Sequence, residues 1–216
     1  MTNPDICPTI TASNAQDYFD QVKAVTQFTK RIHIDLADGI FTPNKLLDIN
    51  DIWWPGGMTA DLHIMYQNPT EILDTVLALR PQLIIVHAEA DGKYVDLVKI
   101  VKAHGIEVGL AILPETEVDA VASVLDETDH LLIFSGNLGH QGGSTADLSL
   151  LSKVAAIRVL KPTIEIGWDG GINLGNAMQI VDGGVDVLNT GSFIQAADNP
   201  STAYWSLRNE VMGIRQ

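Results

Sequence analysis

Eight strand-like segments alternate with helix-like segments from one end of the chain to the other. The fourth of them, Gln82–His87, is a continuous apolar run, which is typical of a parallel strand covered on both faces. Gly, Asn and Pro separate the segments, and no linker or shift in composition divides the series. The expected strands are Asp5–Ile10, Arg31–Leu36, Met58–Met65, Gln82–His87, Ile106–Ile112, His130–Phe134, Thr163–Trp168 and Val185–Thr190.

Helices are expected between these strands. They are Ala15–Thr29, a segment from Asn68-Pro69-Thr70 through Leu79, Tyr94–His104, Glu115–Leu125, Asp147–Leu160, Asn173–Asp182 and Thr202–Ile214, with a short irregular or helical connection at Lys45–Trp54. Eight strands alternating with helices are the pattern of a (β/α)8 TIM barrel, and 216 residues suit a single domain over positions 1–216. A doubly wound sheet is the alternative.

The segment Arg31–Asn44 (RIHIDLADGIFTPN) places two chemically versatile side chains on one strand. Its apolar residues alternate with His33 and Asp35, so the imidazole and the carboxylate share one face. The strand breaks at the turn pair Asp38-Gly39. Two metal-capable side chains near a strand end indicate part of a site, although a satisfied structural pair would have the same pattern.

Two further residues extend this pattern to other strands. His63 lies near the end of the third strand, and Asp169 follows the seventh. Singly, His63 could be a core histidine and Asp169 a helix N-cap. Together with His33 and Asp35 they lie at the strand ends where barrel enzymes place their chemistry. Two imidazoles and two carboxylates there would suit a divalent transition metal.

Three glycine-containing loops are expected on the same rim. The loop Ser135–Ser144 (SGNLGHQGGS) carries four glycines, Asp169-Gly170-Gly171 leads into a helix, and Thr190-Gly191-Ser192 leads into a turn. Glycines let backbone amides approach an anion closely, and loops after the seventh and eighth strands often bind phosphate in barrels. The sequence therefore favours a phosphate-bearing small molecule as ligand.

The charge balance narrows the range of partners. With 13 Lys+Arg against 27 Asp+Glu, the net charge is −14, and no basic patch is present, so nucleic acid is not an expected partner. The single cysteine, Cys7, excludes an intramolecular disulfide and is expected to be a buried thiol. No secretory signal and no membrane-spanning apolar segment is recognisable, which predicts a cytoplasmic protein without membrane contact.

Several motifs resemble the ribulose-phosphate 3-epimerase family over nearly the whole chain. Their order and spacing follow that family. They are PTITAS at Pro8–Ser13, HIDLADGIFTPN at His33–Asn44, DLHIM at Asp61–Met65, VHAEA at Val86–Ala90, WDGGIN at Trp168–Asn173 and NTGSFI at Asn189–Ile194.

The resemblance implies a (β/α)8 barrel that interconverts D-ribulose 5-phosphate and D-xylulose 5-phosphate. It implies one divalent metal ion (Zn, Mn, Fe or Co), an oligomer rather than a monomer, and Asp35 and Asp169 as the proton-transferring pair. The implied metal ligands are His33, Asp35, His63 and Asp169. The implied substrate-binding residues are Thr9, His63, Met65, Gly139, Gly142, Gly143, Gly170, Gly171, Gly191 and Ser192.

This assignment agrees with the chemistry of the residues. Epimerisation next to a ketone removes a proton from one face of a carbon and returns one to the other, which suits two carboxylates acting as base and acid. A metal would polarise the carbonyl and stabilise the enediolate. Which of the two aspartates is the acid stays open.

The chain departs from the family around these residues. Thr9 replaces the usual serine, and Ala37 and Phe134 stand where methionines are usual. The loop after the sixth strand lacks the usual proline and final glutamine and adds His140, either a solvated residue or a ligand contact. Trp168 either narrows the barrel mouth or, as we expect, packs against a helix, and Trp53-Trp54 either cover a loop or form an oligomer contact. The reaction type is therefore better indicated than the substrate.

Three alternatives remain. A related ketose phosphate, such as allulose 6-phosphate, could be the substrate. An aldolase or decarboxylase on a related barrel would be expected to carry a lysine at a strand end, and none is found. A non-catalytic sugar-phosphate binder would have little need of two opposed carboxylates.

Overall fold

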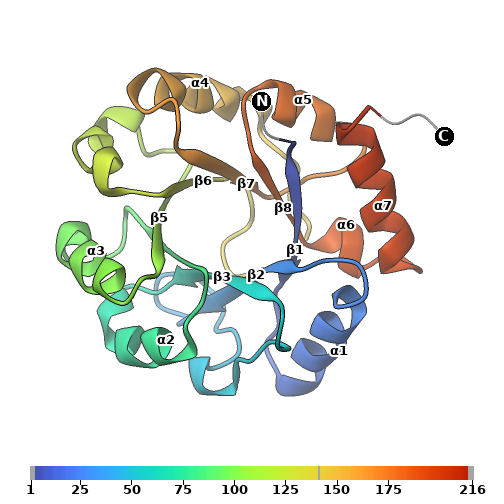
Figure 1. The fold of residues 1–216 in the computed structure, drawn as a ribbon, viewed down its shortest axis with the longest axis horizontal. Helices are drawn as coiled ribbons and strands as arrows, with labels where there is room; N and C mark the ends of the chain where they lie inside the picture. Colours follow the sequence, from blue (N-terminus) through green and yellow to red (C-terminus); the bar gives the residue numbers. More distant parts are fainter. Residues whose placement is uncertain (1–2, 141, 214–216) are drawn as a thin grey trace.

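The computed structural model describes residues 3–140 and 142–213 and contains a closed barrel of eight parallel strands. The strands pair in chain order, and the eighth pairs with the first, so the barrel has no open edge. Seen down the barrel, the helices surround the strands (Figure 1). The predicted (β/α)8 barrel is confirmed, and the closure of the sheet excludes the doubly wound alternative.

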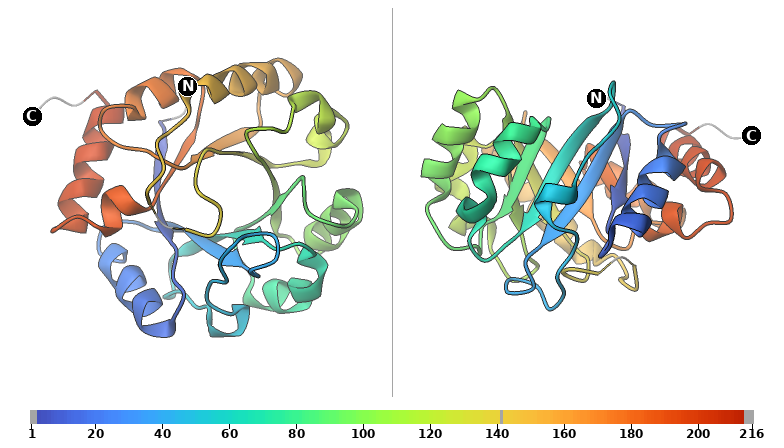
Figure 2. Two further views of the ribbon diagram at one scale, coloured as in Figure 1. Left: turned by 180° about the vertical axis from the view of Figure 1, so that it is seen from behind. Right: turned by 90° about the horizontal axis from the view of Figure 1, so that it is seen from below.

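The strands begin and end within two residues of the expected positions. They are β1 (Asp5–Ile10), β2 (Arg31–Ala37), β3 (Thr59–Met65), β4 (Leu83–His87), β5 (Glu107–Ile112), β6 (His130–Phe134), β7 (Glu165–Asp169) and β8 (Val187–Thr190). The side view in Figure 2 shows the connections after β2 and β6 at one end of the barrel and the N-terminal end of β1 at the other.

Seven α-helices are found among the described residues. They are α1 (Ala15–Val25), α2 (Leu73–Leu79), α3 (Tyr94–Ala103), α4 (Leu151–Leu160), α5 (Ala177–Asp182), α6 (Ser192–Gln195) and α7 (Pro200–Val211). Short 3-10 helices occur at Ile49–Asp51, Pro69–Ile72, Val118–Ala120, Ala122–Glu127 and Leu148–Leu150. No helix of the described chain is both long and apolar enough to cross a membrane.

Four predictions of helices and turns need correction. The helix expected over Asn173–Asp182 begins only at Ala177, as α5. The first helix ends at Val25 rather than Thr29, and the backbone N–H groups of Phe28 and Thr29 both donate to the carbonyl of Val25 in the turn that follows. The helix expected over Glu115–Leu125 is two 3-10 segments with i→i+3 bonds, and the ammonium of Lys161 donates to the carbonyls of Leu125 and Thr128 at their end. The turn expected after Gly191 is the short helix α6. The predicted end of the last helix, at Ile214, lies outside the described residues.

Alternation along the strands separates the barrel interior from its outer layer. On β2, the residues Ile32, Ile34 and Leu36 join the large apolar cluster that packs the strands against the helices. The side chains between them, His33 and Asp35, therefore point into the barrel, as the period-2 pattern predicts. A small separate cluster inside the barrel contains Leu83, Ile85, Ala111 and Leu132.

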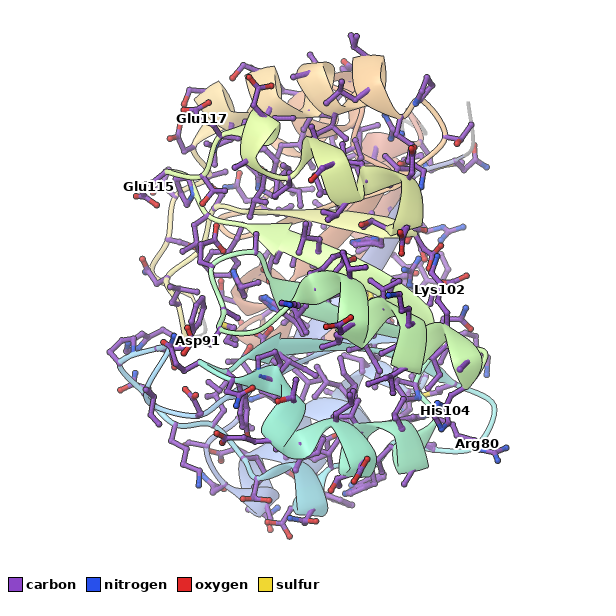
Figure 3. The ribbon with its side chains drawn as sticks, turned by 90° about the vertical axis from the view of Figure 1, so that its left-hand side faces the viewer. Arg80, Asp91, Lys102, His104, Glu115 and Glu117 are labelled. Carbon is purple, nitrogen blue, oxygen red and sulfur yellow. The ribbon has the colours of Figure 1, made fainter. Side chains whose placement is uncertain are left out.

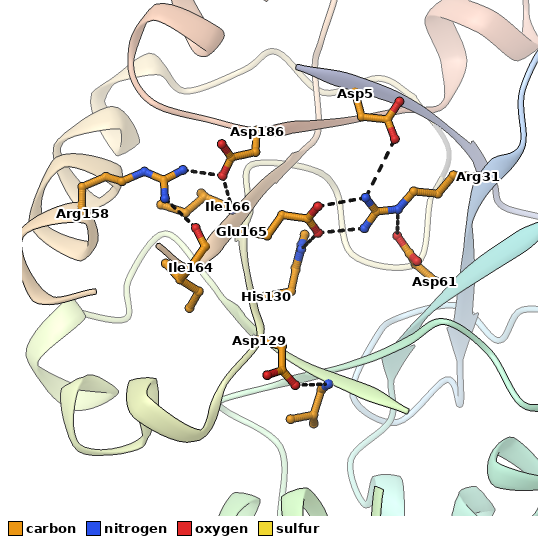
Figure 4. A network of polar contacts seen from close by, with 11 residues as sticks. Asp5, Arg31, Asp61, Asp129, His130, Arg158, Ile164, Glu165, Ile166 and Asp186 are labelled. Carbon is orange, nitrogen blue, oxygen red and sulfur yellow. Dashed lines mark hydrogen bonds and ion pairs between the residues drawn. The ribbon is translucent and has the colours of Figure 1, made fainter. Parts of the chain in front are cut away.

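The opposite, N-terminal end of the barrel holds a network of charged residues (Figure 4). Arg31 donates from Nε to Asp61 (2.8 Å) and from both Nη atoms to Glu165 (3.0 and 2.8 Å). Glu165 Oε2 also lies 2.7 Å from Nδ1 of His130. Asp61 and His130 are almost completely buried. This network connects β2, β3, β6 and β7 at the end of the barrel remote from the predicted site.

Candidate active site

The four residues predicted as metal ligands come together at the C-terminal ends of the strands. In the β2–β3 register Asp35 lies beside His63, and Oδ1 of Asp35 is 3.0 Å from Nδ1 of His63. Oδ2 of Asp169 lies 3.6 Å from Nε2 of His33 and 3.8 Å from Nδ1 of His63. All four side chains are buried, and one candidate ligand atom from each lies within 4.8 Å of the others.

The donor set fits a divalent metal ion. Two imidazole nitrogens and two carboxylate oxygens are ligands that Zn²⁺ and neighbouring transition metals accept. Both ring nitrogens of His33 are buried without a hydrogen-bond partner among the described residues. A buried polar nitrogen without a partner is energetically unfavourable, and coordination of a cation would satisfy the nitrogen that faces the carboxylates.

The two carboxylates differ in their electrostatic surroundings. Burial and the nearby charge of Asp35 raise the pKa of Asp169 to about 7. Burial also disfavours the charged form of Asp35, but the nearby imidazole of His33, with Nε2 3.4 Å from Oδ1, and the contact with His63 outweigh it and hold the pKa of Asp35 well below its ordinary value. Burial lowers the pKa of His63 to about 4, which favours the neutral imidazole that a metal requires.

Hydrogen bonds outside the cluster hold the carboxylate of Asp35 and the backbone of Asp169 in place. The Thr11 hydroxyl donates to Oδ2 of Asp35 at 2.7 Å, and the backbone N–H of Ser135 donates to the carbonyl of Asp169 at 2.7 Å. Thr11 was not among the predicted site residues, and the N-cap of α1 is Asn14. The position of Thr11, two residues after Thr9 and just past the end of β1, was the available signal for this role.

A recess beside the cluster contains most of the predicted substrate-binding residues. Gly143 lines an adjoining open cavity instead, and His63 lies buried behind Asp35. The predicted residues that line the recess are Thr9, Met65, Gly139, Gly142, Gly170, Gly171, Gly191 and Ser192, together with Asp35 and Asp169.

The recess also has buried polar groups without partners, of which Asn189 was not predicted from the sequence. Asn189, beside Asp169 in the β7–β8 register, lines it with both amide atoms buried and unpaired among the described residues. The hydroxyl of Thr9 is likewise buried without a partner. These groups are available to a polar ligand. No lysine or arginine is among the described residues that line the recess.

Glycine is required where the loops after β6 and β7 meet. Gly170 and Gly171 have φ values of +113° and +69°, in the region that disfavours other residues. A Cβ on Gly171 would lie 2.0 Å from the backbone nitrogen of Ala146, and one on Gly170 would lie 2.3 Å from that of Gly136. The two loops are therefore packed backbone to backbone at the rim of the recess.

The residues that depart from the family pattern have defined places in the structure. Met65 packs with Ala37 and Leu46, and Phe134 lines the recess. His140 is exposed, and its ring contacts the side-chain amide of Asn44 while lining the recess. Trp168 is fully buried and donates from Nε1 to the carbonyl of Gly170 (3.0 Å), so the packing interpretation is confirmed. Cys7 is buried, as predicted.

Comparison with known proteins identifies similar sequences of known family. The ribulose-phosphate 3-epimerase of Mycobacterium tuberculosis is 30% identical over 221 residues, which cover 96% of this chain and 93% of that protein. The ribulose-phosphate 3-epimerase of Helicobacter pylori strain J99 is 25% identical, covering 94% of this chain and 96% of that protein.

Among solved structures, 3-hexulose-6-phosphate synthase from Salmonella typhimurium superposes with a TM-score of 0.73. The superposition covers 98% of this chain and 100% of the other at 14% identity, a likeness that shows the fold alone. A sequence model of the ribulose-phosphate 3 epimerase family matches residues 5–195, nearly the whole barrel. The chain belongs to the ribulose-phosphate 3-epimerase family.

Proposed function

We propose that this protein is a metal-dependent isomerase that interconverts D-ribulose 5-phosphate and D-xylulose 5-phosphate by moving the proton at C3. The observation that carries the proposal is the pair of buried carboxylates, Asp35 and Asp169, which share one histidine cluster but differ in pKa. Two titratable groups whose surroundings push their pKa values apart are suited to act as base and acid.

Asp35 acts as the base and Asp169 as the acid in one direction of the reaction. Asp35 takes the C3 proton from one face, and the electron pair of the broken C–H bond passes into an enediolate. Asp169 then gives its proton to C3 on the other face. Asp35 ends protonated and Asp169 ionised, so the reverse reaction uses them in exchanged roles. The Thr11 hydroxyl orients Asp35 throughout.

His33, Asp35, His63 and Asp169 would hold one divalent ion, whose chemistry is that of a Lewis acid, polarising the C2 carbonyl and stabilising the enediolate. The ligand types are compatible with Zn, Mn, Fe or Co. His33 and His63 hold the cluster from the inner side, away from the recess, because both imidazoles are completely buried.

The phosphate of the substrate would bind to backbone amides of the loops after β6, β7 and β8. Gly142 lies against Ser192, where an added Cβ would approach the serine Cβ to 3.0 Å. Gly139, Gly142 and Gly171 have positive φ values, which bring main-chain groups to the surface of the recess. Backbone amides can bind an anion without a basic side chain, consistent with the lining described above.

A second candidate substrate is a longer ketose phosphate such as allulose 6-phosphate. An open cavity of about 720 Å³ adjoins the recess and shares Phe134, Gly136 and Asn137 with it. An additional carbon could extend into this cavity while the two aspartates kept the same proton transfer. Three further points remain predictions: that the chain forms a single domain, that it is oligomeric, and that it is cytoplasmic.

The test is incubation of metal-loaded protein with ribulose 5-phosphate in D2O, with C3 observed by NMR. We expect deuterium at C3 together with xylulose 5-phosphate. Asp35→Asn and Asp169→Asn should each lower the rate by about 10²–10⁴-fold, the usual contribution of a general acid or base. The exposed Asp119→Asn variant is the matched control. Binding without exchange for every ketose phosphate tried would identify a non-catalytic binder.

A further inference from the structure

His63 makes contacts through both of its ring nitrogens. Nδ1 faces Asp35 inside the cluster, whereas Nε2 lies 2.9 Å from Nε2 of His87, at the end of β4. On the far side of that ring, Nδ1 of His87 lies 3.3 Å from Oε2 of Glu89. A line of polar contacts therefore runs from the cluster through two buried imidazoles to a carboxylate outside it.

When Nδ1 of His63 binds a metal instead of donating to Asp35, the protons along this line have one consistent arrangement. A hydrogen bond between two imidazole nitrogens needs one donor and one acceptor. For Nδ1 of His63 to offer its lone pair to a metal, the ring proton must be on Nε2. Nε2 of His87 must then accept, which places the proton of His87 on Nδ1, facing the carboxylate of Glu89.

Glu89 is held as an acceptor by groups on its other oxygen. Oε1 accepts from the backbone N–H of Leu113 at 3.0 Å and from the hydroxyl of Thr116. Burial disfavours the charged carboxylate, but hydrogen bonds from His87, Thr116 and Leu113 outweigh burial and lower the pKa of Glu89 to about 2. Both carboxylate oxygens of Glu89 therefore act as hydrogen-bond acceptors, Oε1 toward Leu113 and Thr116 and Oε2 toward His87.

Lys153 of α4 fixes the segment that provides these donors. Its ammonium group donates to the carbonyls of Leu113 (3.2 Å), Pro114 (2.7 Å) and Thr116 (2.6 Å). The Lys153 side chain is buried against this connection after β5. The position of Glu89 is thus determined by two elements, β5 and α4, that contribute nothing to the metal cluster itself.

Aromatic side chains enclose the pair of imidazoles. The ring of Phe41 lies 4.9 Å from that of His87, and the ring of Phe134 lies 5.8 Å from both His87 and His63. The side chains of both histidines are completely buried. Water therefore has little access to His87, and the protein must supply its hydrogen-bond partners.

We propose that His87 and Glu89 are positioning residues of the metal centre, which hold His63 in the tautomer that leaves Nδ1 free to bind a divalent cation. The inference rests on the metal-dependent function proposed above. Neither residue lines the described recess, so both act through His63. Partners of this kind on a metal-binding histidine fix its ring orientation and tautomer.

Glu89→Gln is the decisive substitution because it changes one atom. The N–H of Leu113 can only donate, so the amide oxygen of glutamine must remain on that edge. The amide NH2 then faces Nδ1 of His87 and drives the ring proton to Nε2. That proton would oppose the Nε2–H of His63, so the arrangement that favours metal binding is lost.

The first readout is Zn²⁺ affinity, measured by competition with a chromogenic chelator. We expect Glu89→Gln to weaken binding by about 10–100-fold, the usual effect of losing such a partner. The control is Glu117→Gln, the same chemical change at an exposed position on the edge of the molecule (Figure 3). His87→Gln, which keeps an acceptor toward His63, should lose less affinity than His87→Leu.

The second readout is the tautomer of each ring, from long-range ¹H–¹⁵N NMR spectra of the zinc-loaded, ¹⁵N-labelled protein. We expect Nε2–H on His63 and Nδ1–H on His87 in the unsubstituted protein. A proton on Nε2 of His87, or equal Zn²⁺ affinity for the Glu89→Gln and Glu117→Gln proteins, would overturn the proposal. The spectra of the unsubstituted protein test the proposed tautomers even if a variant fails to fold.

Neither readout depends on turnover of a sugar phosphate. A protein with the expected tautomers that failed to exchange C3 would contradict the proposed function and leave this inference standing. Conversely, full epimerase activity with the opposite tautomer on His87 would contradict this inference alone.

Discussion

Replacing Arg31 with methionine removes the cation that links Asp61 and Glu165 at the N-terminal end of the barrel. The Asp61 carboxylate, only 1% exposed, lies 2.8 Å from Nε of Arg31. Two charges at that distance attract by about 6 kcal/mol at an effective dielectric constant of about 20. The Glu165 side chain is 36% exposed, so solvent screening reduces its share.

Desolvation offsets part of this attraction, but removing one partner leaves the other charge buried. We therefore expect Arg31→Met to lower the free energy of unfolding at neutral pH by about 3–5 kcal/mol. Such a loss is a large fraction of the 5–15 kcal/mol that is typical of a folded protein. Arg31→Met/Asp61→Asn should recover most of it, because the buried charge is removed as well.

The pH dependence provides an independent check on this reasoning. Burial raises the pKa of Asp61, and the charge of Arg31 opposes that rise. Without Arg31 the pKa of Asp61 rises further, so the folded variant retains a proton that the unfolded chain would release. A group with a raised folded pKa loses its stabilising contribution as pH rises through that value. The deficit of Arg31→Met should therefore be largest at pH 8 and shrink toward pH 5.

Urea unfolding followed by tryptophan fluorescence measures both quantities, since the Trp168 ring is fully buried. The unsubstituted protein and the double variant are the references at each pH. A deficit below about 1 kcal/mol that did not change with pH would refute the reasoning, because it would show that solvent reaches Asp61 and screens it as at the surface.

Three further predictions concern the site itself. Removing the metal with a chelator should lower the melting temperature in differential scanning fluorimetry, because a ligand at 100 times its Kd stabilises the folded state by about 2.7 kcal/mol; an unchanged melting temperature would argue against a bound ion. In metal-free protein, Asp169→Asn should gain stability relative to the unsubstituted protein as pH rises toward about 7, because the folded protein holds the Asp169 proton up to a pKa of about 7 whereas the unfolded chain releases it at an ordinary aspartate pKa; the same difference in unfolding free energy between the two proteins at pH 5 and pH 8 would contradict this. Gly171→Ala should raise KM for a sugar phosphate, since the Cβ added at Gly171 would meet the backbone of Ala146 at 2.0 Å. The control is Gly57→Ala, at a glycine that also has a positive φ but has open space around it. Equal KM values for the two variants would show that the loop contact does not shape the recess.

The sequence was sufficient to predict the barrel and the four clustered side chains. Both follow from local rules: alternation places His33 and Asp35 inside, and closure brings the ends of β2, β3 and β7 to one rim. The family and the reaction class were likewise confirmed by the comparisons. The individual roles of the site residues stay predictions.

Other features could not be predicted because they depend on contacts between distant segments. The expected helix over Glu115–Leu125 has a reasonable helical composition, yet Lys161, which caps its carbonyls as 3-10 turns, comes from the end of α4. The link from Glu89 to Leu113 likewise spans two strands. Local periodicity carries no information about such partners, whereas it determines which face of a strand is inward.

The pairing of β1 with β8 has a consequence for biosynthesis. Thr9 on β1 and Ser192 after β8 line the same recess, and Gln195 donates to the carbonyl of Thr9 across 186 positions of sequence. A nascent chain that has not yet released β8 from the ribosome therefore has two unpaired sheet edges and half a ligand pocket. Pairing of strands that are far apart in sequence is a slow step in folding. The ability to bind a ligand should therefore arise last, and its appearance would mark the moment at which the barrel is complete.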